Sequence, residues 1–356
     1  MKRLIPLLLV VLMLLAACGK NPEATVPETT TQPPTQEPTV VTEPVIAFRN
    51  PLNGTPLETP WDSRALAIVM PNDPNALPHH GVSQADFLYE LEVEGGITRC
   101  MAVFGDYAEI EKIGPVRSAR TFFTNISVAY DAPMAHCGGS AQALNGQYDD
   151  SGDTVANWEH INEFHNGSYF FRDKDRYNYQ GYLWEHCLFT DGERMKNCMT
   201  ARGYDKTYEG GADYGLTFDE EVDMTGGETA NTVYVTFRGG KKTTMTYNAD
   251  RGLYESTQYN EAYIDANDNS RVGFRNVLIL QADQWHDGSG YRTFYDLIGS
   301  GNGLFACDGK IVPITWTREH LREPFTYALS DGTPLTLGTG HTYVGIHSPK
   351  STSTYE

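Results

Sequence analysis

The sequence lacks the short motifs that identify the commoner catalytic and metal sites. It contains neither an H-E-x-x-H segment nor a G-x-S-x-G serine elbow, and its cysteines never take the C-x-x-C spacing of a zinc site. The histidines form no ligand triplet either. We therefore expect no metal ion and no cofactor, and the function has to be sought in other features of the chain.

Basic residues are scarce. The chain has 27 lysines and arginines against 46 aspartates and glutamates. Lys2 and Arg3 belong to the signal peptide predicted below, so the mature chain keeps 25 basic residues against 46 acidic ones, a formal charge of −21. Proteins bind phosphate backbones and anionic lipid surfaces through lysine and arginine, so this charge argues against nucleic acid as a partner.

Only the N-terminus carries a long apolar run. Lys2 and Arg3 precede the run from Leu4 to Leu15, and Ala16 and Ala17 lead into Cys18. The run is too short to cross a bilayer comfortably, and a membrane span needs no small residues before a cysteine. The order instead predicts a signal peptide over residues 1–17 and lipid attachment at Cys18, which would anchor the protein to the outer face of a bacterial cell membrane.

The next segment has no aromatic residue. Residues 19–45 contain six prolines and seven threonines. Such a composition buries too little surface to offset the entropy of ordering, so residues 18–45 are predicted to be a lipidated cysteine followed by a disordered tether. At about 3.1 Å per residue, a polyproline-like tether reaches on the order of 80 Å.

From Phe48 onward the composition is that of a folded protein, and we expect an α+β fold. A segment rich in glycine, aspartate and glutamate, 204–227, divides it into a mixed α/β N-terminal domain over 46–205 and a mainly antiparallel β domain over 228–350. A helix is predicted over 116–130. The second half contains six predicted strands and a hairpin turn at Asp308-Gly309. These strands are 232–237, 243–247, 271–281, 303–307, 310–316 and 342–347.

A hairpin over residues 87–104 carries the first candidate site residues. Apolar and polar residues alternate on both sides of Gly95-Gly96. A two-residue turn would place Glu92 opposite Arg99 and Glu90 opposite Met101, with Glu90, Glu92, Glu94 and Arg99 together on one face. The other face, which would form the core, would hold Phe87, Tyr89, Leu91, Val93, Cys100, Ala102 and Phe104.

An arginine segment follows. Residues 112–120 are predicted to be a loop that enters the helix with Pro115 as the first helical residue, which would place Arg117 and Arg120 on one face. Arginines in a first helical turn are unfavourable because the helix dipole is positive there. Negative charge must compensate them. Either the hairpin glutamates supply it in a structural ion-pair network, or a bound phosphate, pyrophosphate or acidic sugar supplies it in a site.

Residues 136–140 supply the last two candidates. His136 precedes Cys137, Gly138 and Gly139, and Ser140 follows them. Backbone amides of such a turn form an anion-binding nest in some proteins, with His136 and Ser140 beside it, although a tight turn without a ligand is the commoner meaning. Gly299, Gly301 and Gly303 form a G-x-G-x-G pattern, which we interpret as a loop or bulge because no helix follows.

The remaining cysteines are odd in number, and most are interpreted as buried thiols. They are Cys100, Cys137, Cys187, Cys198 and Cys307, with a Cys187–Cys198 disulfide as the alternative.

Aromatic residues gather between 158 and 184. They are interpreted as core under a long loop, with a sugar-stacking or interface surface as the alternative.

Several of these segments resemble the YerB-type lipoproteins. The segments 93–99 (VEGGITR) and 113–120 (IGPVRSAR), with His136 and Gly138 to Ser140, resemble the N-terminal domain of that family, and 299–310, Thr315-Trp316 and 331–340 resemble its C-terminal domain. The resemblance covers nearly all of the chain after the tether. It implies export and two domains but no catalytic residues, because the family has no known function. Cys100 and Cys137 depart from it, since ordinary apolar residues are expected there.

Two classes of function follow. The first is a binding or scaffold lipoprotein that holds an envelope polymer or an envelope protein in the groove beside Arg99, Arg117 and Arg120, or on the aromatic loop. The second is an envelope enzyme that acts on a phosphate-containing glycopolymer or a lipid-pyrophosphate. In the order of its segments, though not in matched motifs, the chain is similar to the LytR-CpsA-Psr phosphotransferases, in which arginines hold a pyrophosphate.

Overall fold

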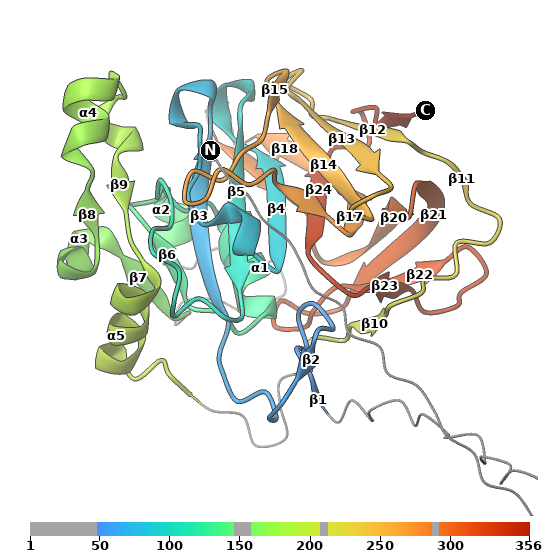
Figure 1. Ribbon diagram of the computed structural model, residues 1–356, viewed down its shortest axis with the longest axis horizontal. Helices are drawn as coiled ribbons and strands as arrows, with labels where there is room; N and C mark the ends of the chain where they lie inside the picture. Colours follow the sequence, from blue (N-terminus) through green and yellow to red (C-terminus); the bar gives the residue numbers. More distant parts are fainter. Residues whose placement is uncertain (1–47, 146–157, 207–212, 287–291) are drawn as a thin grey trace, which may run out of the picture. The chain divides into compact units, whose positions relative to one another are not determined.

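The computed structural model describes residues 48–145, 158–206, 213–286 and 292–356 (Figure 1). The predicted signal peptide, Cys18 and the tether lie outside the described residues and stay predictions. None of the described helices combines the length and the apolar character that a membrane crossing requires.

A mixed sheet of eleven strands forms the centre of the protein. The strand order is β11-β21-β20-β17-β24-β4-β5-β3-β6-β7, with β22 paired to β21. Its inner strands are buried on both faces, which explains why β3 is almost continuously apolar. The strands are β3 (Leu66–Asn72), β4 (Phe87–Glu92), β5 (Thr98–Phe104), β6 (Met134–His136), β7 (His160–Asn162), β11 (Glu228–Thr229), β17 (Asn276–Gln281), β20 (Gly299–Cys307), β21 (Lys310–Arg318), β22 (Thr326–Leu329) and β24 (Thr342–His347).

A second, antiparallel sheet covers one face of the central sheet. Burial alternates along β12 and β14, because one side of each strand packs inward and the other faces solvent. Val233, Val235 and Met245 share a core with Leu66 and Ile68 of the central sheet. The strands of the second sheet are β12 (Thr232–Thr236), β13 (Lys242–Asn248), β14 (Leu253–Gln258), β15 (Glu261–Ala262), β16 (Gly273–Phe274) and β25 (Thr354–Tyr355).

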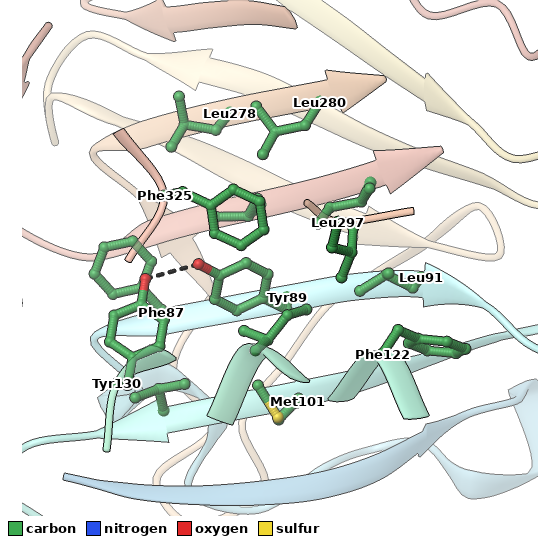
Figure 2. Packing of buried hydrophobic residues seen from close by; sticks show 14 of the residues in the cluster. Phe87, Tyr89, Leu91, Met101, Phe122, Tyr130, Leu278, Leu280, Leu297 and Phe325 are labelled. Carbon is green, nitrogen blue, oxygen red and sulfur yellow. Dashed lines mark hydrogen bonds between the residues drawn. The ribbon is translucent and has the colours of Figure 1, made fainter. Parts of the chain in front are cut away.

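Helix α1 covers the opposite face. Phe122 packs there with Phe87, Tyr89 and Leu91 of β4, and the hydroxyls of Tyr89 and Tyr130 lie 2.7 Å apart (Figure 2). The helices are α1 (Thr121–Ala129), α2 (Ala141–Asn145), α3 (Glu163–Asn166), α4 (Lys174–Gln180) and α5 (Gly192–Arg202). Four strand pairs complete the fold: β1 (Phe48–Arg49) with β2 (Pro56–Leu57), β8 (Phe171–Arg172) with β9 (Leu188–Phe189), β10 (Thr217–Asp219) with β23 (Thr336–Gly338), and β18 (Gln284–His286) with β19 (Thr293–Tyr295).

The two halves of the chain share the central sheet. Strand β24, from the second half, lies between β4 and β17 and is parallel to both (Figure 1). Residues Ile46–Glu356 accordingly form one compact unit. The expected α+β class is therefore confirmed only as a strand-rich fold with mixed and antiparallel sheets, since strands from both sides of segment 204–227 pair directly.

Five of the six strand predictions in the second half are confirmed, although β20 begins four residues earlier than predicted. The predicted strand 271–281 is divided between β16 of the second sheet and β17 of the central sheet. Cys307 pairs with Lys310 across Asp308-Gly309, and both turn residues have positive φ, as this two-residue turn requires. The interpretation of the G-x-G-x-G pattern as a loop or bulge is wrong, because it forms the first half of β20. Glycine fits there since a Cβ on Gly301 would lie 2.5 Å from the Gln281 carbonyl oxygen of β17. All five predicted thiols are free, so the Cys187–Cys198 disulfide is not formed.

A buried ion pair joins the two sheets. Glu90 of β4 has no exposed surface, and the ammonium group of Lys241 pairs with its carboxylate. The same carboxylate accepts hydrogen bonds from Asn72 at 2.8 Å, Thr98 at 2.6 Å, Thr243 at 2.7 Å and Tyr343 at 2.8 Å. Burial alone would raise the pKa of Glu90, but the charge and hydrogen bond of Lys241, together with the hydrogen bonds of Thr98 and Thr243, outweigh it and lower that pKa.

We expect Lys241→Met to destabilise the protein by about 3–5 kcal/mol, because it leaves a buried carboxylate without a cation. Lys242→Met is the matched control, since Lys242 is exposed at the start of β13 and should change the free energy of unfolding by less than ~0.5 kcal/mol. Urea unfolding of the full chain in detergent measures both. Equal effects of the two substitutions would show that the ion pair contributes nothing specific.

His79 makes a second buried connection between the halves. Its Nδ1 lies 2.6 Å from the Tyr263 hydroxyl and its Nε2 2.6 Å from the Pro71 carbonyl oxygen. The neutral ring satisfies both contacts by donating to Pro71 and accepting from Tyr263. Burial, the largest cause, lowers the pKa of His79 to about 3, and the charge of Arg176 adds to it.

Folding therefore excludes a proton from His79. Its contribution to stability is complete above pH ~6.5, the ordinary pKa of histidine, and decreases as the pH falls from there toward 3. Between pH 7 and pH 5 the loss should be about 2 kcal/mol. His79→Gln should remove that share of the pH dependence of urea unfolding, whereas His320→Gln, an exposed control, should not. The same pH dependence in His79→Gln would contradict the assignment.

Candidate functional site

The hairpin connection between β4 and β5 is one residue longer than the sequence predicts. Glu90 pairs with Cys100, Leu91 with Arg99 and Glu92 with Thr98. The Val93 amide donates to the Ile97 carbonyl at 2.8 Å and closes a three-residue connection. A shift of one residue moves a whole strand to the opposite face, so the prediction that Arg99 shares a face with Glu90 and Glu92 is wrong.

The same shift corrects the predicted apolar face. Cys100, Ala102 and Phe104 point with Glu90 toward the second sheet, not with Phe87 toward α1. Glu92 also points there, where its carboxylate accepts from the Gly239 amide and, at 3.1 Å, from the Gln284 side chain. Glu90 and Glu92 are thus structural groups of the interface between the sheets, and neither pairs with an arginine.

The arginine segment is extended where a helix was predicted. Its main-chain amides form hydrogen bonds with carbonyl oxygens of neighbouring segments. The amide of Val116 donates to Leu188 at 2.7 Å, that of Arg117 to Val69 at 2.8 Å and that of Ala119 to Gly138 at 3.0 Å. These bonds compete with helix formation, so α1 begins at Thr121 and not at Pro115. Arg120 is its N-cap residue and supplies no side-chain cap, which leaves the positive end of the helix dipole without a carboxylate cap.

Arg99, Arg117, Arg120 and Glu94 lie together where β4 ends and α1 begins, and we call them the arginine site. Arg120 pairs with both oxygens of Glu94, with its Nη2 at 2.7 Å and its Nε at 2.8 Å. Arg99 donates from Nη1 to the Ser118 carbonyl at 2.6 Å. Arg117 has a longer ion pair, 3.4 Å, with the exposed Glu185. Each guanidinium group thus has a different partner, although Arg99 lies within electrostatic range of both Arg117 and Arg120. The prediction that Arg117 and Arg120 share a helical face is wrong, because both precede α1 in an extended segment.

Positive charge dominates the arginine site. Burial lowers the pKa of Arg99 to about 9, and the charges of Arg120 and Arg117 lower it further than Glu94 can offset. Burial would raise the pKa of Glu94, but its hydrogen bonds to Arg120 hold it below its ordinary value. A positive potential of this kind favours a bound anion.

Arg292 also reaches the site, with its Nη1 3.4 Å from Glu94. Sequence reasoning missed both Arg292 and Glu185, because they lie far from the hairpin in the chain and no local pattern marks them. Only the pairing of the strands brings them to the site.

His136 and Ser140 lie beside the arginine segment, but their polar groups are engaged elsewhere. His136 makes hydrogen-bonding contacts with His160 at 2.9 Å and the Gly138 carbonyl at 2.7 Å, and burial lowers its pKa to about 4. The Ser140 hydroxyl accepts from the Ala143 amide and caps α2.

The main-chain amides of this turn are engaged as well, which agrees with a tight turn without a ligand and not with the alternative of an anion-binding nest. The Cys137 amide donates to the Arg117 carbonyl oxygen at 3.0 Å, and the Ser140 amide donates to the Ala119 carbonyl oxygen at 3.3 Å. The Gly138 amide donates to the side-chain oxygen of Asn162 at 3.0 Å. Main-chain donors that already have acceptors are not available to a ligand. Within the described ranges, no group of three histidine, cysteine, aspartate or glutamate side chains is placed to hold a metal ion.

The position of the arginine site in the sheet supports a binding role. Strands β3, β4, β6, β7 and β24 all run in one direction, and the arginine site lies at the carboxyl end of β4. A pocket of about 510 Å³, lined among others by Trp61, Asp86 and His341, lies at the opposite, amino end. Open sheets with parallel strands bind ligands beyond their carboxyl ends, so we favour the arginine site.

Two family models match the chain. Residues 52–205 match the family model described as protein of unknown function (DUF3048), N-terminal domain, and residues 233–344 match its C-terminal domain. The chain is 27% identical over 318 residues to the Bacillus subtilis (strain 168) protein named "Putative lipoprotein YerB", covering 87% of this chain and 89% of that protein. The crystal structure of YerB from Bacillus subtilis matches with a TM-score of 0.70 at 25% identity, covering 86% of this chain and 99% of that one.

Proposed function

Because the chain belongs to the two-domain family of unknown function DUF3048, whose description assigns no activity, we propose a function from the arginine site itself. The protein is a lipoprotein of the cell envelope that binds an anionic group of an envelope ligand between Arg99, Arg117 and Arg120. The observation that carries this proposal is the buried Arg99 guanidinium, which lies among two other arginines with Glu94 as the nearby carboxylate.

The proposed anchor is supported by the N-terminal sequence and by the relative. The similar Bacillus subtilis protein is named as a lipoprotein, and Cys18 of this chain follows an apolar run and two alanines. Lipidation there, followed by the proline- and threonine-rich segment, would hold the folded unit outside the membrane on a long tether.

Binding is favoured over catalysis by the groups near the arginines. An enzyme acting on a phosphate ester or pyrophosphate would need an acid–base group at the site. His136 is neutral and paired with His160, and Ser140 caps a helix, so neither predicted candidate is placed for that role.

Arg117→Ala should weaken phosphate binding at least tenfold, because Arg117 is the most accessible guanidinium of the three and has only the long contact with Glu185 to lose. Inorganic phosphate at ten times its Kd should stabilise the full chain by ~1.4 kcal/mol and raise Tm by roughly 2–4 °C. A thermal-shift titration in detergent measures this. Arg251→Ala is the control, since Arg251 pairs with Glu255 on the second sheet. A Tm that phosphate leaves unchanged in the wild-type chain would refute the proposal.

Glu94→Gln should have the opposite sign. The carboxylate of Glu94 already offsets part of the positive charge of the arginine site. Its replacement by a neutral amide should therefore tighten phosphate binding by about tenfold, or ~1.4 kcal/mol. Glu193→Gln on α5, an exposed glutamate, should change nothing. Weaker binding in Glu94→Gln would mean that Glu94 is needed to position Arg120 and does not compete with the ligand.

A further inference from the structure

Exposed aromatic side chains gather in one part of the described chain. Of its eight exposed large apolar residues, five lie between residues 164 and 184. They include Trp184, which is 46% exposed, and Tyr177, whose ring lies edge-on 5.2 Å from the Trp184 ring. The aromatic cluster predicted as core is thus divided, since Trp158 and Phe170 are buried while Tyr177, Tyr179 and Trp184 face solvent.

These rings are held on a braced segment. The buried Arg176 donates to the carbonyl oxygens of Ala76 at 2.6 Å and Pro78 at 3.2 Å, and the Tyr182 hydroxyl donates to Leu77 at 2.9 Å. Lys112 pairs with Asp173 at 2.5 Å at the start of α4. Ordering this surface on binding therefore costs little conformational entropy, as a preformed binding platform requires.

The exposed aromatic surface of Tyr177 and Trp184 adjoins the arginine site. Glu185, the residue after Trp184, pairs with Arg117, and Arg172 donates to the Trp184 carbonyl at 2.9 Å while its guanidinium lies 5.2 Å from the indole centroid. Arg172 and Arg117 thus both contact the segment Trp184-Glu185. A ligand stacked on the indole can therefore also reach the Arg172 guanidinium.

The chemistry of this surface suits a sugar. An indole ring offers a flat apolar face for the C–H face of a pyranose, and the neighbouring arginines and Glu185 offer hydrogen bonds to hydroxyl groups. A polyanionic partner is disfavoured because the whole chain has a formal charge of −19. The ligand should instead carry its negative charge at one point.

We propose that Trp184, with Tyr177 and Arg172 beside it, is the sugar-stacking part of the arginine site, so that the ligand is a glycan or sugar that carries a localised phosphoryl group. This inference rests on the proposed function, because it takes the phosphoryl group to lie at Arg99, Arg117 and Arg120. It adds the class of ligand and names Trp184 as the residue that recognises the sugar.

Calorimetric titration of the full chain in detergent tests the inference with three probes: inorganic phosphate, N-acetylglucosamine and N-acetylglucosamine 1-phosphate. The sugar phosphate should bind about tenfold tighter than inorganic phosphate, which is the usual scale of one aromatic contact. Trp184→Ala should remove that gain and leave the affinity for inorganic phosphate unchanged, and Trp184→Phe should restore most of it. Circular dichroism and urea unfolding of each variant would show that it is folded.

Trp285→Ala is the matched control, because Trp285 is 42% exposed and its ring stacks on Phe294 of β19. If the gain disappears in Trp285→Ala and not in Trp184→Ala, the inference is wrong in its residue. If the sugar adds nothing to phosphate binding, the inference fails while the proposed function stands. If neither phosphate probe binds, both fail. If Trp184→Ala weakens adsorption to phosphatidylcholine vesicles and leaves sugar phosphate binding intact, the surface is a membrane contact and the inference is overturned.

Discussion

The rest of the structure depends on the neutralisation of Glu90. A carboxylate without exposed surface is tolerable only with a cation and hydrogen-bond donors around it, and Lys241 and four side-chain donors supply them from both halves of the chain. The second sheet is therefore fixed against the central sheet at this point. Because Glu90 and its neighbour Glu92 are used there, neither is available to the arginines on the other face, and the arginine site keeps a surplus of positive charge.

One additional residue in the hairpin connection places Glu90 and Glu92 on the face of the sheet opposite Arg99. The connection Glu94–Gly96 has one residue more than a two-residue turn, and Gly95 and Gly96 both have positive φ, which glycine adopts without strain. With the shorter connection, Arg99 would lie with the glutamates and a balanced ion-pair network would form. With the longer one, Arg99 points toward the start of α1, where the helix dipole adds to the positive potential.

The sequence predicted local features and missed those that depend on distant partners. Apolar patterns identified several strands of the second half but not β14 or β22. The Asp308-Gly309 turn was recognisable because its backbone demands such residues. The nearness of Arg99 to Arg117 and Arg120 was also within reach. The hairpin register was not, since Val93 and Ile97 can be paired in more than one way by pattern alone. Neither was the insertion of β24 beside β4, because parallel pairing of strands about 250 residues apart leaves no local signal.

The contrast between the charge of the whole chain and that of the arginine site limits what can bind there. Negative charges spread over the surface repel a polyanion along its length, within a Debye length of about 10 Å, while three guanidinium groups attract at one point. A long anionic polymer gains little under these conditions. A ligand with its charge at one end gains the full attraction and exposes an uncharged remainder to the surface. In the proposed site that remainder would lie on the exposed indole of Trp184, whose neighbour Glu185 pairs with Arg117. Selection for localised charge thus follows from the acidic composition of the chain as much as from the arginines.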